Sequence, residues 1–127
     1  MGLVSAMAKI LLADDEPVLL GLLAGMLEYA GHEVVAVSNG NALLDTCSSA
    51  FDLVITDLIM PEKEGIETII ELRRGFPKLK IVAMSGGGRG DAHGYLRLAE
   101  KLGAAAILEK PFERDELIAL VNKVLAK

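Results

Sequence analysis

A chain of 127 residues, of which 52% are hydrophobic, has room for one compact domain with a well-buried core. Its formal net charge of −5 argues against the broad basic surface that binding to a phosphate backbone needs, so we expect no nucleic-acid partner. Cys47 is the only cysteine, which excludes an internal disulfide and favours the cytoplasm, and no apolar run approaches the roughly 20 residues that span a membrane.

The first half of the chain alternates strand and helix patterns. An apolar run of strand length at residues 10–13 is followed by a helical pattern that begins at Pro17 and ends before Gly31. A second strand-length run follows at residues 34–37, and residues 39–48 are a weaker helical candidate. The apolar positions of the first helix recur at three- and four-residue steps, and they are Val18, Leu19, Leu22, Leu23, Met26 and Leu27.

The second half repeats this alternation. Strand-length runs lie at residues 53–56, 81–84 and 105–108. A helical pattern at residues 66–72 ends before Phe76, a weaker one at residues 92–102 is closed by Gly103, and a last one covers residues 117–125. We expect the apolar stripes of these helices, together with Phe112, to lie in the core.

Five strand-then-helix units predict an α/β fold with a single doubly wound five-stranded parallel sheet and helices on both faces. The strand runs are nearly continuous in apolar character, which is typical of strands covered on both faces. We expect residues 1–8 to be an N-terminal extension without an export signal, and residues 9–127 to form the domain.

Polar residues stand where the apolar runs end. The first run ends at Asp14 and Asp15, the third at Asp57, the fourth at Ser85 and the fifth at Lys110. Because ligands of open parallel sheets bind beyond the carboxyl ends of the strands, we expect these side chains to converge. Crowded carboxylates favour a hard divalent cation such as Mg²⁺, while Lys110 and Ser85 suit a phosphoryl group. The set predicts phosphoryl transfer onto a carboxylate.

With these residues in order, the chain resembles the receiver domain of the bacterial two-component response regulators, in the chemotaxis-type single-domain form. The matching pieces are Asp14-Asp15-Glu16-Pro17, Asp57-Leu58-Ile59-Met60-Pro61 with Gly65, Ser85-Gly86 and Lys110-Pro111-Phe112. The resemblance covers nearly the whole chain and implies a flavodoxin-like sheet of strand order 2-1-3-4-5.

The resemblance also implies roles. Asp57 accepts the phosphoryl group from a histidine kinase or a phosphotransfer protein, and Ser85 and Lys110 hold phosphoryl oxygens. Asp15, Asp57 and the backbone carbonyl of Ile59 bind Mg²⁺, and Asp14 acts largely through water. The Lys110-Pro111 peptide bond is expected to be cis. A downstream protein docks on the fourth helix, the fifth strand and the last helix, so the domain is a phosphoacceptor rather than an enzyme.

Three positions depart from the family pattern or vary within it. Ile107 stands where receivers usually carry an aromatic residue or histidine, so we hypothesise that residues 86–90 carry more of the switch. Ile59 and Gly87 occupy positions that tune dephosphorylation in the family. Neither side chain can hold an attacking water, which predicts a phosphorylated state without a strong hydrolysis aid.

Other interpretations fit the sequence less well. A haloacid-dehalogenase-type phosphatase needs an Asp-x-Asp motif after the first strand, where this chain has Glu16, and a flavin binder needs a Ser/Thr-rich phosphate loop there. The glycine-rich residues 85–94 lack the spacing of a nucleotide-binding loop. We expect His32 and His93 to be solvated and Cys47 to pack on a helix. Within the receiver interpretation, the sequence leaves open a stand-alone switch, a phosphate relay or sink, and part of a larger regulator or hybrid kinase.

Overall fold

The computed structural model describes residues 7–58, 65–86 and 92–127, and within them five strands alternate with five helices. The strands are β1 Lys9–Ala13, β2 Glu33–Val37, β3 Leu53–Asp57, β4 Lys80–Gly86 and β5 Ala106–Lys110. The helices are α1 Pro17–Tyr29, α2 Gly40–Thr46, α3 Gly65–Gly75, α4 Ala92–Lys101 and α5 Arg114–Leu125. None of these helices is both long and apolar enough to cross a membrane.

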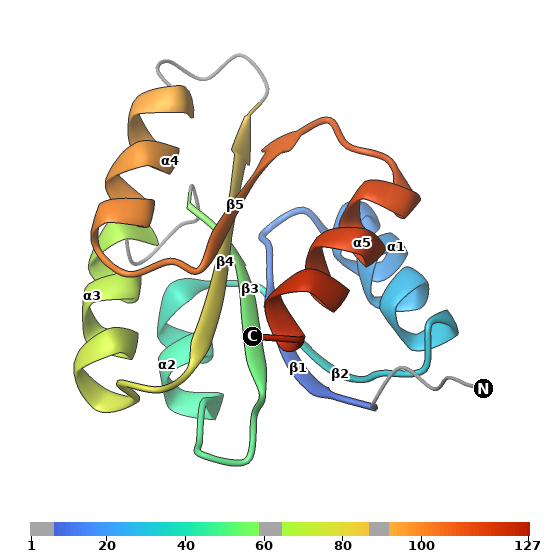
Figure 1. Ribbon diagram of the computed structural model, residues 1–127, viewed down its shortest axis with the longest axis horizontal. Helices are drawn as coiled ribbons and strands as arrows, with labels where there is room; N and C mark the ends of the chain where they lie inside the picture. Colours follow the sequence, from blue (N-terminus) through green and yellow to red (C-terminus); the bar gives the residue numbers. More distant parts are fainter. Residues whose placement is uncertain (1–6, 59–64, 87–91) are drawn as a thin grey trace.

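The strands form one parallel sheet in the order β2-β1-β3-β4-β5, which confirms the predicted flavodoxin-like α/β fold. Helices α1 and α5 cover one face of the sheet, and α2, α3 and α4 cover the other (Figure 1). Because successive strand residues point to opposite faces, Leu11 and Val54 join the core under α2, α3 and α4, while Leu12 and Ile55 join the core under α1 and α5.

The prediction that every strand is covered on both faces holds only for the centre of the sheet. Strand β3 is buried throughout, and β1 and β4 are buried except at their ends. The edge strands differ, since no residue of β2 is fully buried and only Leu108 is buried in β5. An edge strand lacks a neighbour on one side and is short of helix cover, which a continuous apolar run in the sequence does not reveal.

Helix α1 contradicts the prediction that its whole apolar stripe lies in the core. Leu23 and Leu27 are buried, but Val18 is 83% exposed and Leu22 is 55% exposed. In the sequence, every position of this helix except Glu28 is apolar, small or uncharged, so residue type alone does not separate the inner face from the outer one. The structure therefore leaves a nearly uncharged helix face open to solvent.

His32 was expected to be solvated, and this prediction was wrong. Gly31 adopts a positive φ of 101° after α1, and His32 then turns back so that its backbone N–H donates to the carbonyl of Leu27. Its imidazole is 5% exposed, and Nδ1 accepts a hydrogen bond of 3.1 Å from the backbone N–H of Ala8. Burial lowers the pKa of His32. The side chain of His93 lies outside the described part.

Cys47 and Phe112 behave as expected. Cys47 follows α2 and packs against the core under α2, α3 and α4, and Phe112 packs against the opposite core. Burial raises the pKa of the Cys47 thiol, although a backbone hydrogen bond at Ser48 acts in the other direction. The thiol therefore stays protonated at neutral pH and serves as a packing group.

Candidate functional site

Three carboxylates meet at the carboxyl end of the sheet. Asp14 and Asp15 follow β1, Asp57 ends β3, and one oxygen from each lies within 4.8 Å of the others. Asp14 and Asp57 are buried, whereas Asp15 is exposed. The central position of β1 and β3 in the sheet places the three acids together, as the sequence predicted, and leaves the cluster open to solvent on the Asp15 side.

Lys110, at the end of β5, provides the positive charge that balances this cluster in part. Its Nζ donates to Oδ2 of Asp14 at 2.9 Å and to Oδ2 of Asp57 at 3.2 Å. Burial by itself lowers the pKa of Lys110, but the hydrogen bonds and charges of Asp14 and Asp57 outweigh it and raise the pKa above its ordinary value. The ammonium therefore remains charged and joins two carboxylates.

Asp14 is held from two sides. Its Oδ1 accepts a hydrogen bond of 2.9 Å from the backbone N–H of Glu16, in the turn that leads into α1, and its Oδ2 accepts from Lys110. A buried carboxylate with both oxygens occupied keeps one orientation. Asp14 thus acts as a fixed anchor for Lys110, while Asp15 is free of such restraint on its exposed side.

The donor set fits a hard divalent cation. Three carboxylates against one ammonium leave an excess of negative charge, which a cation of charge +2 neutralises. Oxygen ligands without histidine or cysteine favour Mg²⁺, which keeps several water ligands and tolerates a small number of protein ligands. Asp15 and Asp57 would be its direct ligands. The carbonyl of Ile59, which was expected to complete the set, lies outside the described residues.

Ser85 lies near the end of β4 and is fully buried, yet its Oγ has no hydrogen-bond partner among the described residues. Met84 is the register partner of Asp57, so Ser85 stands one residue beyond the level of Asp57 in the neighbouring strand. Unpaired buried hydroxyls are uncommon in folded proteins and call for an explanation. An oxygen-rich group added to Asp57 would supply the missing acceptor.

Two features near the site escaped sequence reasoning. The buried hydroxyl of Thr56 donates to the carbonyl of Asp57 at 2.9 Å and so restrains the acceptor's own peptide group. Gly86 has a positive φ of 156°, and a Cβ placed on it would lie 2.5 Å from the carbonyl oxygen of Lys110. Only glycine permits that approach of β4 to β5. In the sequence, these contacts are not indicated by a threonine at the end of an apolar run or by a glycine before other glycines.

The assignment of the chain to a family rests on a match to the sequence model of a known family. The model described as "Response regulator receiver domain" matches residues 10–122. The chain belongs to the response regulator receiver domain family. The cis Lys110-Pro111 bond agrees with the expectation for this family, and the match removes the support for the phosphatase and flavin-binding alternatives.

Known relatives of this receiver domain vary in length. This receiver domain is 36% identical over 121 residues to the transcriptional regulatory protein CpxR of Escherichia coli. The match covers 95% of this chain and 50% of CpxR. A receiver domain protein of Clostridium thermocellum is 31% identical with a TM-score of 0.86, covering 94% of this chain and 95% of that one. The chemotaxis response regulator CheY4 of Vibrio cholerae is 26% identical, with a TM-score of 0.81 over 94% and 99% of the two chains.

These relatives do not confirm the single-domain, chemotaxis-type form expected from the sequence. The receiver domain spans 50% of the length of CpxR and 24% of the length of the DNA-binding transcriptional regulator NtrC of Azospirillum brasilense. Membership of the receiver family is therefore established, whereas the type of regulator is a separate question.

Of the remaining predicted positions, Ile107 lies among the described residues and the others lie outside them. Ile107, in β5, is half-buried and packs against the core under α2, α3 and α4. Ile59 and Gly87, expected to influence dephosphorylation, lie outside the described residues, and so do positions 87–90 of the glycine-rich loop. Predictions that depend on them stand as sequence-based expectations.

Proposed function

We propose that this receiver domain is a signalling switch that takes a phosphoryl group from a phosphohistidine onto Asp57 in a Mg²⁺-dependent reaction. The observation that carries the proposal is the buried Asp57 carboxylate, which lies within reach of Asp14, Asp15 and Lys110 at the open end of the sheet. In this proposal residues 9–127 act as one unit. The protein works in the cytoplasm, the location expected from the sequence.

The proposed chemistry uses few residues. A carboxylate oxygen of Asp57 attacks the phosphorus, an O–P bond forms as the N–P bond of the phosphohistidine breaks, and the imidazole leaves with the electron pair. Bound Mg²⁺ supplies positive charge to the transferring oxygens. Lys110 already lies 3.2 Å from Asp57 and provides a second positive charge for a phosphoryl oxygen. Asp14 keeps Lys110 in place.

The phosphorylated state differs from the resting one around Ser85. A phosphoryl group adds about 1.5 to 2 negative charges and new acceptor oxygens. The Oγ of Ser85, which has no partner among the described residues, can then donate to one of them, so the end of β4 moves toward Asp57. Helix α4 packs against β4 and β5. The change at the acceptor thus reaches the α4, β5 and α5 face.

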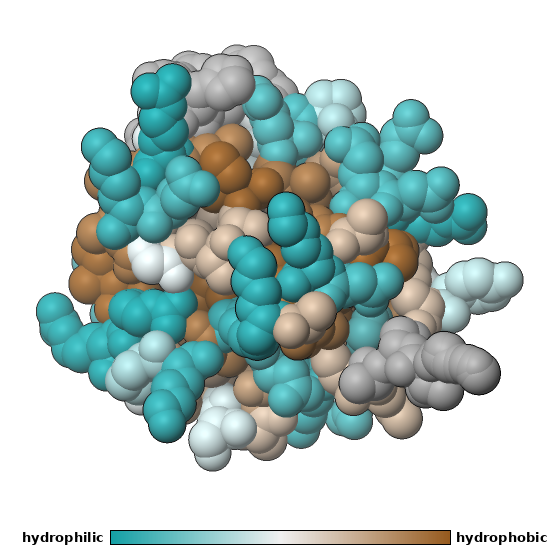
Figure 2. Space-filling model, in the orientation of Figure 1, coloured by the Kyte–Doolittle hydropathy of each residue, from teal (hydrophilic) through white to brown (hydrophobic). Residues whose placement is uncertain are grey.

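That face is the proposed docking surface for a downstream protein. Strand β5 is an edge strand with α4 on one side and α5 on the other (Figure 1). Figure 2, in the same orientation, shows apolar groups between the hydrophilic side chains of this view. Because Ile107 stands here in place of an aromatic side chain, the change in shape comes from the backbone of β4 rather than from a rotating ring.

The phosphoryl donor must dock beside the acceptor. Helix α1 starts directly after Asp15, and its exposed Val18 and Leu22 are one helical turn apart. An apolar face at this place fits an apolar helix surface on a histidine kinase or a phosphotransfer protein better than it fits water. We therefore assign this face to the donor and the α4, β5 and α5 face to the downstream protein.

A second candidate role is that of the receiver part of a longer regulator. The relatives favour it, since CpxR is about twice as long as the matched region. The reading frame that encodes this chain and its neighbours distinguishes the two roles: a continuous frame into a second domain supports the longer regulator, and an adjacent histidine kinase gene identifies the donor in either case.

The chemistry itself is tested with acetyl phosphate and Mg²⁺, followed by intact-protein mass spectrometry. The wild-type chain should gain one phosphoryl group, and Asp57→Asn should gain none. Asp45→Asn, which changes an exposed carboxylate in α2, is the matched control and should behave as wild type. A phosphoryl group on Asp57→Asn, or none on the wild type, would overturn the proposal.

A further inference from the structure

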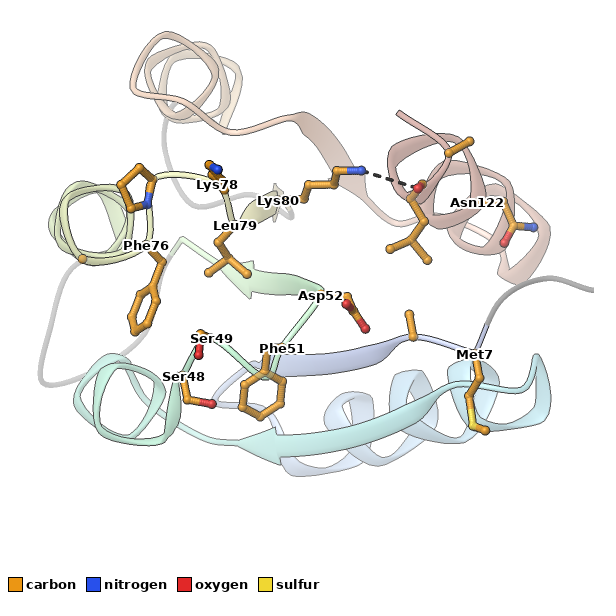
Figure 3. Close-up of a pocket in the computed structure, with 15 residues that line it drawn as sticks. Met7, Ser48, Ser49, Phe51, Asp52, Phe76, Lys78, Leu79, Lys80 and Asn122 are labelled. Carbon is orange, nitrogen blue, oxygen red and sulfur yellow. Dashed lines mark hydrogen bonds between the residues drawn. The ribbon is translucent and has the colours of Figure 1, made fainter.

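A cavity of about 1110 Å³ lies at the opposite end of the sheet from Asp57. It is formed where β3 and β4 begin, between the loop that follows α2, the loop that follows α3 and the end of α5 (Figure 3). It is as large as typical small-molecule sites, which measure roughly 300 to 1,000 Å³. The phosphoryl chemistry does not use it, because the acidic cluster is at the other end of the strands.

The wall of this cavity is mainly apolar. Phe51 and Leu79 line it just before β3 and β4 begin, each with 8% of its surface exposed, and Phe76 lines it after α3 (Figure 3). Leu125, in the last turn of α5, lines the opposite side. Two aromatic rings and two leucines form a surface that an alkyl chain or a ring can cover.

The charged groups around the cavity favour an anion. Lys78 and Lys80 line it, and among the described lining residues Asp52 carries the one acidic side chain. That carboxylate already accepts a hydrogen bond of 2.8 Å from the backbone N–H of Lys9. The ammonium of Lys9 lies 4.9 Å from the centre of the Phe51 ring and adds positive charge nearby. The excess of positive charge contrasts with the net charge of −5 of the whole chain.

Lys80 is oriented for a ligand by the end of α5. Its Nζ donates to the carbonyl of Lys127 at 2.5 Å and more weakly to that of Leu125 at 3.4 Å (Figure 3). An ammonium has three N–H donors, so these two bonds leave one for a further acceptor.

We propose that this cavity binds a small amphipathic carboxylate. The apolar body lies against Phe51, Phe76 and Leu79, and the carboxylate lies beside Lys78 and Lys80. An anionic head can accept from Lys78 and from the remaining N–H donor of Lys80. The proposal is independent of the function assigned to Asp57, since it uses other residues at the other end of the sheet.

The test titrates the protein with octanoate and with 1-octanol, followed by amide nitrogen–proton NMR spectra. Octanoate should bind saturably, shift the amide signals of Phe51, Leu79 and Lys80, and bind more tightly than 1-octanol. Lys78→Gln should weaken octanoate binding about two- to fivefold, the effect of a partly exposed ion pair, and leave 1-octanol unchanged. Ser49→Phe, which places a ring at the cavity wall, should weaken both.

Control measurements test whether a loss of octanoate binding is specific to the cavity. Lys78 and Ser49 are exposed, so neither variant disturbs the core, and gain of a phosphoryl group from acetyl phosphate confirms that each is folded. Lys101→Gln removes an exposed lysine that does not line the cavity, and this variant should bind octanoate as the wild type does. Octanoate binding that is non-saturable, equal to that of 1-octanol, unaffected by both cavity variants, or mapped to another surface overturns the proposal.

Discussion

The Nζ atom of Lys110 lies 2.9 Å from Oδ2 of Asp14, closer than the 3.2 Å that separates it from Oδ2 of Asp57. The ammonium is thus anchored on one carboxylate and reaches a second, that of Asp57, the proposed phosphoacceptor. In the resting chain it acts as the counter-ion of the acidic cluster. A divalent cation bound to the same cluster competes with it.

This competition gives the first prediction. Replacing the ammonium in Lys110→Met removes a positive charge from the cluster, so Mg²⁺ should bind about three- to tenfold more tightly. Calorimetric titration of the unphosphorylated protein measures the effect. Lys101→Met, which changes a distant exposed lysine, should leave the dissociation constant unchanged, and a weaker affinity in Lys110→Met would contradict the competition.

The second prediction concerns Ser85, whose buried hydroxyl lacks a partner among the described residues. Removing an unsatisfied buried group relieves a cost, so Ser85→Ala should leave the free energy of unfolding unchanged or raise it by about 1 kcal/mol. The same variant should bind beryllofluoride, a phosphoryl mimic, less tightly. Urea denaturation and a beryllofluoride titration measure the two effects. A clear loss of stability would show that the hydroxyl has a partner in the resting state.

The third prediction follows from the approach of Gly86 to the backbone of Lys110. A Cβ at 2.5 Å from the Lys110 carbonyl oxygen must push β5 away, so Gly86→Ala should lower the free energy of unfolding by about 2 to 3 kcal/mol. Gly25→Ala is the matched control, because a Cβ there meets nothing within 4 Å in an exposed helical position, and it should raise stability by about 0.5 to 1 kcal/mol. Equal effects of the two substitutions would refute the steric account.

The fourth prediction is a pH dependence that comes from His32. Burial lowers its pKa, so the folded chain favours the neutral imidazole, while the unfolded chain takes up a proton below its ordinary pKa of 6.5. This contribution to stability is therefore fully present above pH 6.5 and decreases as the pH falls through the lowered value. Protonation also turns Nδ1 into a donor, which opposes the N–H of Ala8. Urea midpoints between pH 5 and 8 should show a smaller slope in His32→Gln than in wild type.

The fifth prediction separates the donor's docking surface from the chemistry. Val18→Lys with Leu22→Lys places two charges on the exposed face of α1, so transfer from a phosphorylated histidine kinase should slow about tenfold or more. Phosphorylation by acetyl phosphate should not change, since a small donor needs no docking face. If both rates fall together, the substitutions act on the fold or on Asp57 instead.

The sequence predicted the fold and the acidic cluster well, because both depend on patterns along the chain. Continuous apolar runs separated by helical stripes determine a parallel sheet, and the residues that end central strands necessarily meet at one edge. Asp14, Asp15 and Asp57 lie together for this reason, and Lys110 reaches Asp14 and Asp57 from the edge strand β5. The order of the strands came from the family resemblance and not from the patterns.

What the sequence missed depends on packing and side-chain conformation rather than on patterns along the chain. The burial of His32 requires the N–H of Ala8 to lie next to it, 24 positions away, and no local pattern indicates this. Val18 and Leu22 are apolar like the buried Leu23, so only the packing of α1 on the sheet separates them. The hydrogen bond from Thr56 to Asp57 depends on a rotamer, which a sequence does not specify.

The Ser85 hydroxyl, which lacks a partner among the described residues, affects the free-energy difference between the resting and the phosphorylated arrangement. A resting chain that already tolerates an unsatisfied hydroxyl lies closer to the phosphorylated arrangement than one whose hydroxyl is paired, because no existing bond has to break first. The phosphoryl group then shifts the population by making a contact rather than by exchanging one. A larger share of the free energy of the contacts that the phosphoryl group makes is then available to drive the change in conformation.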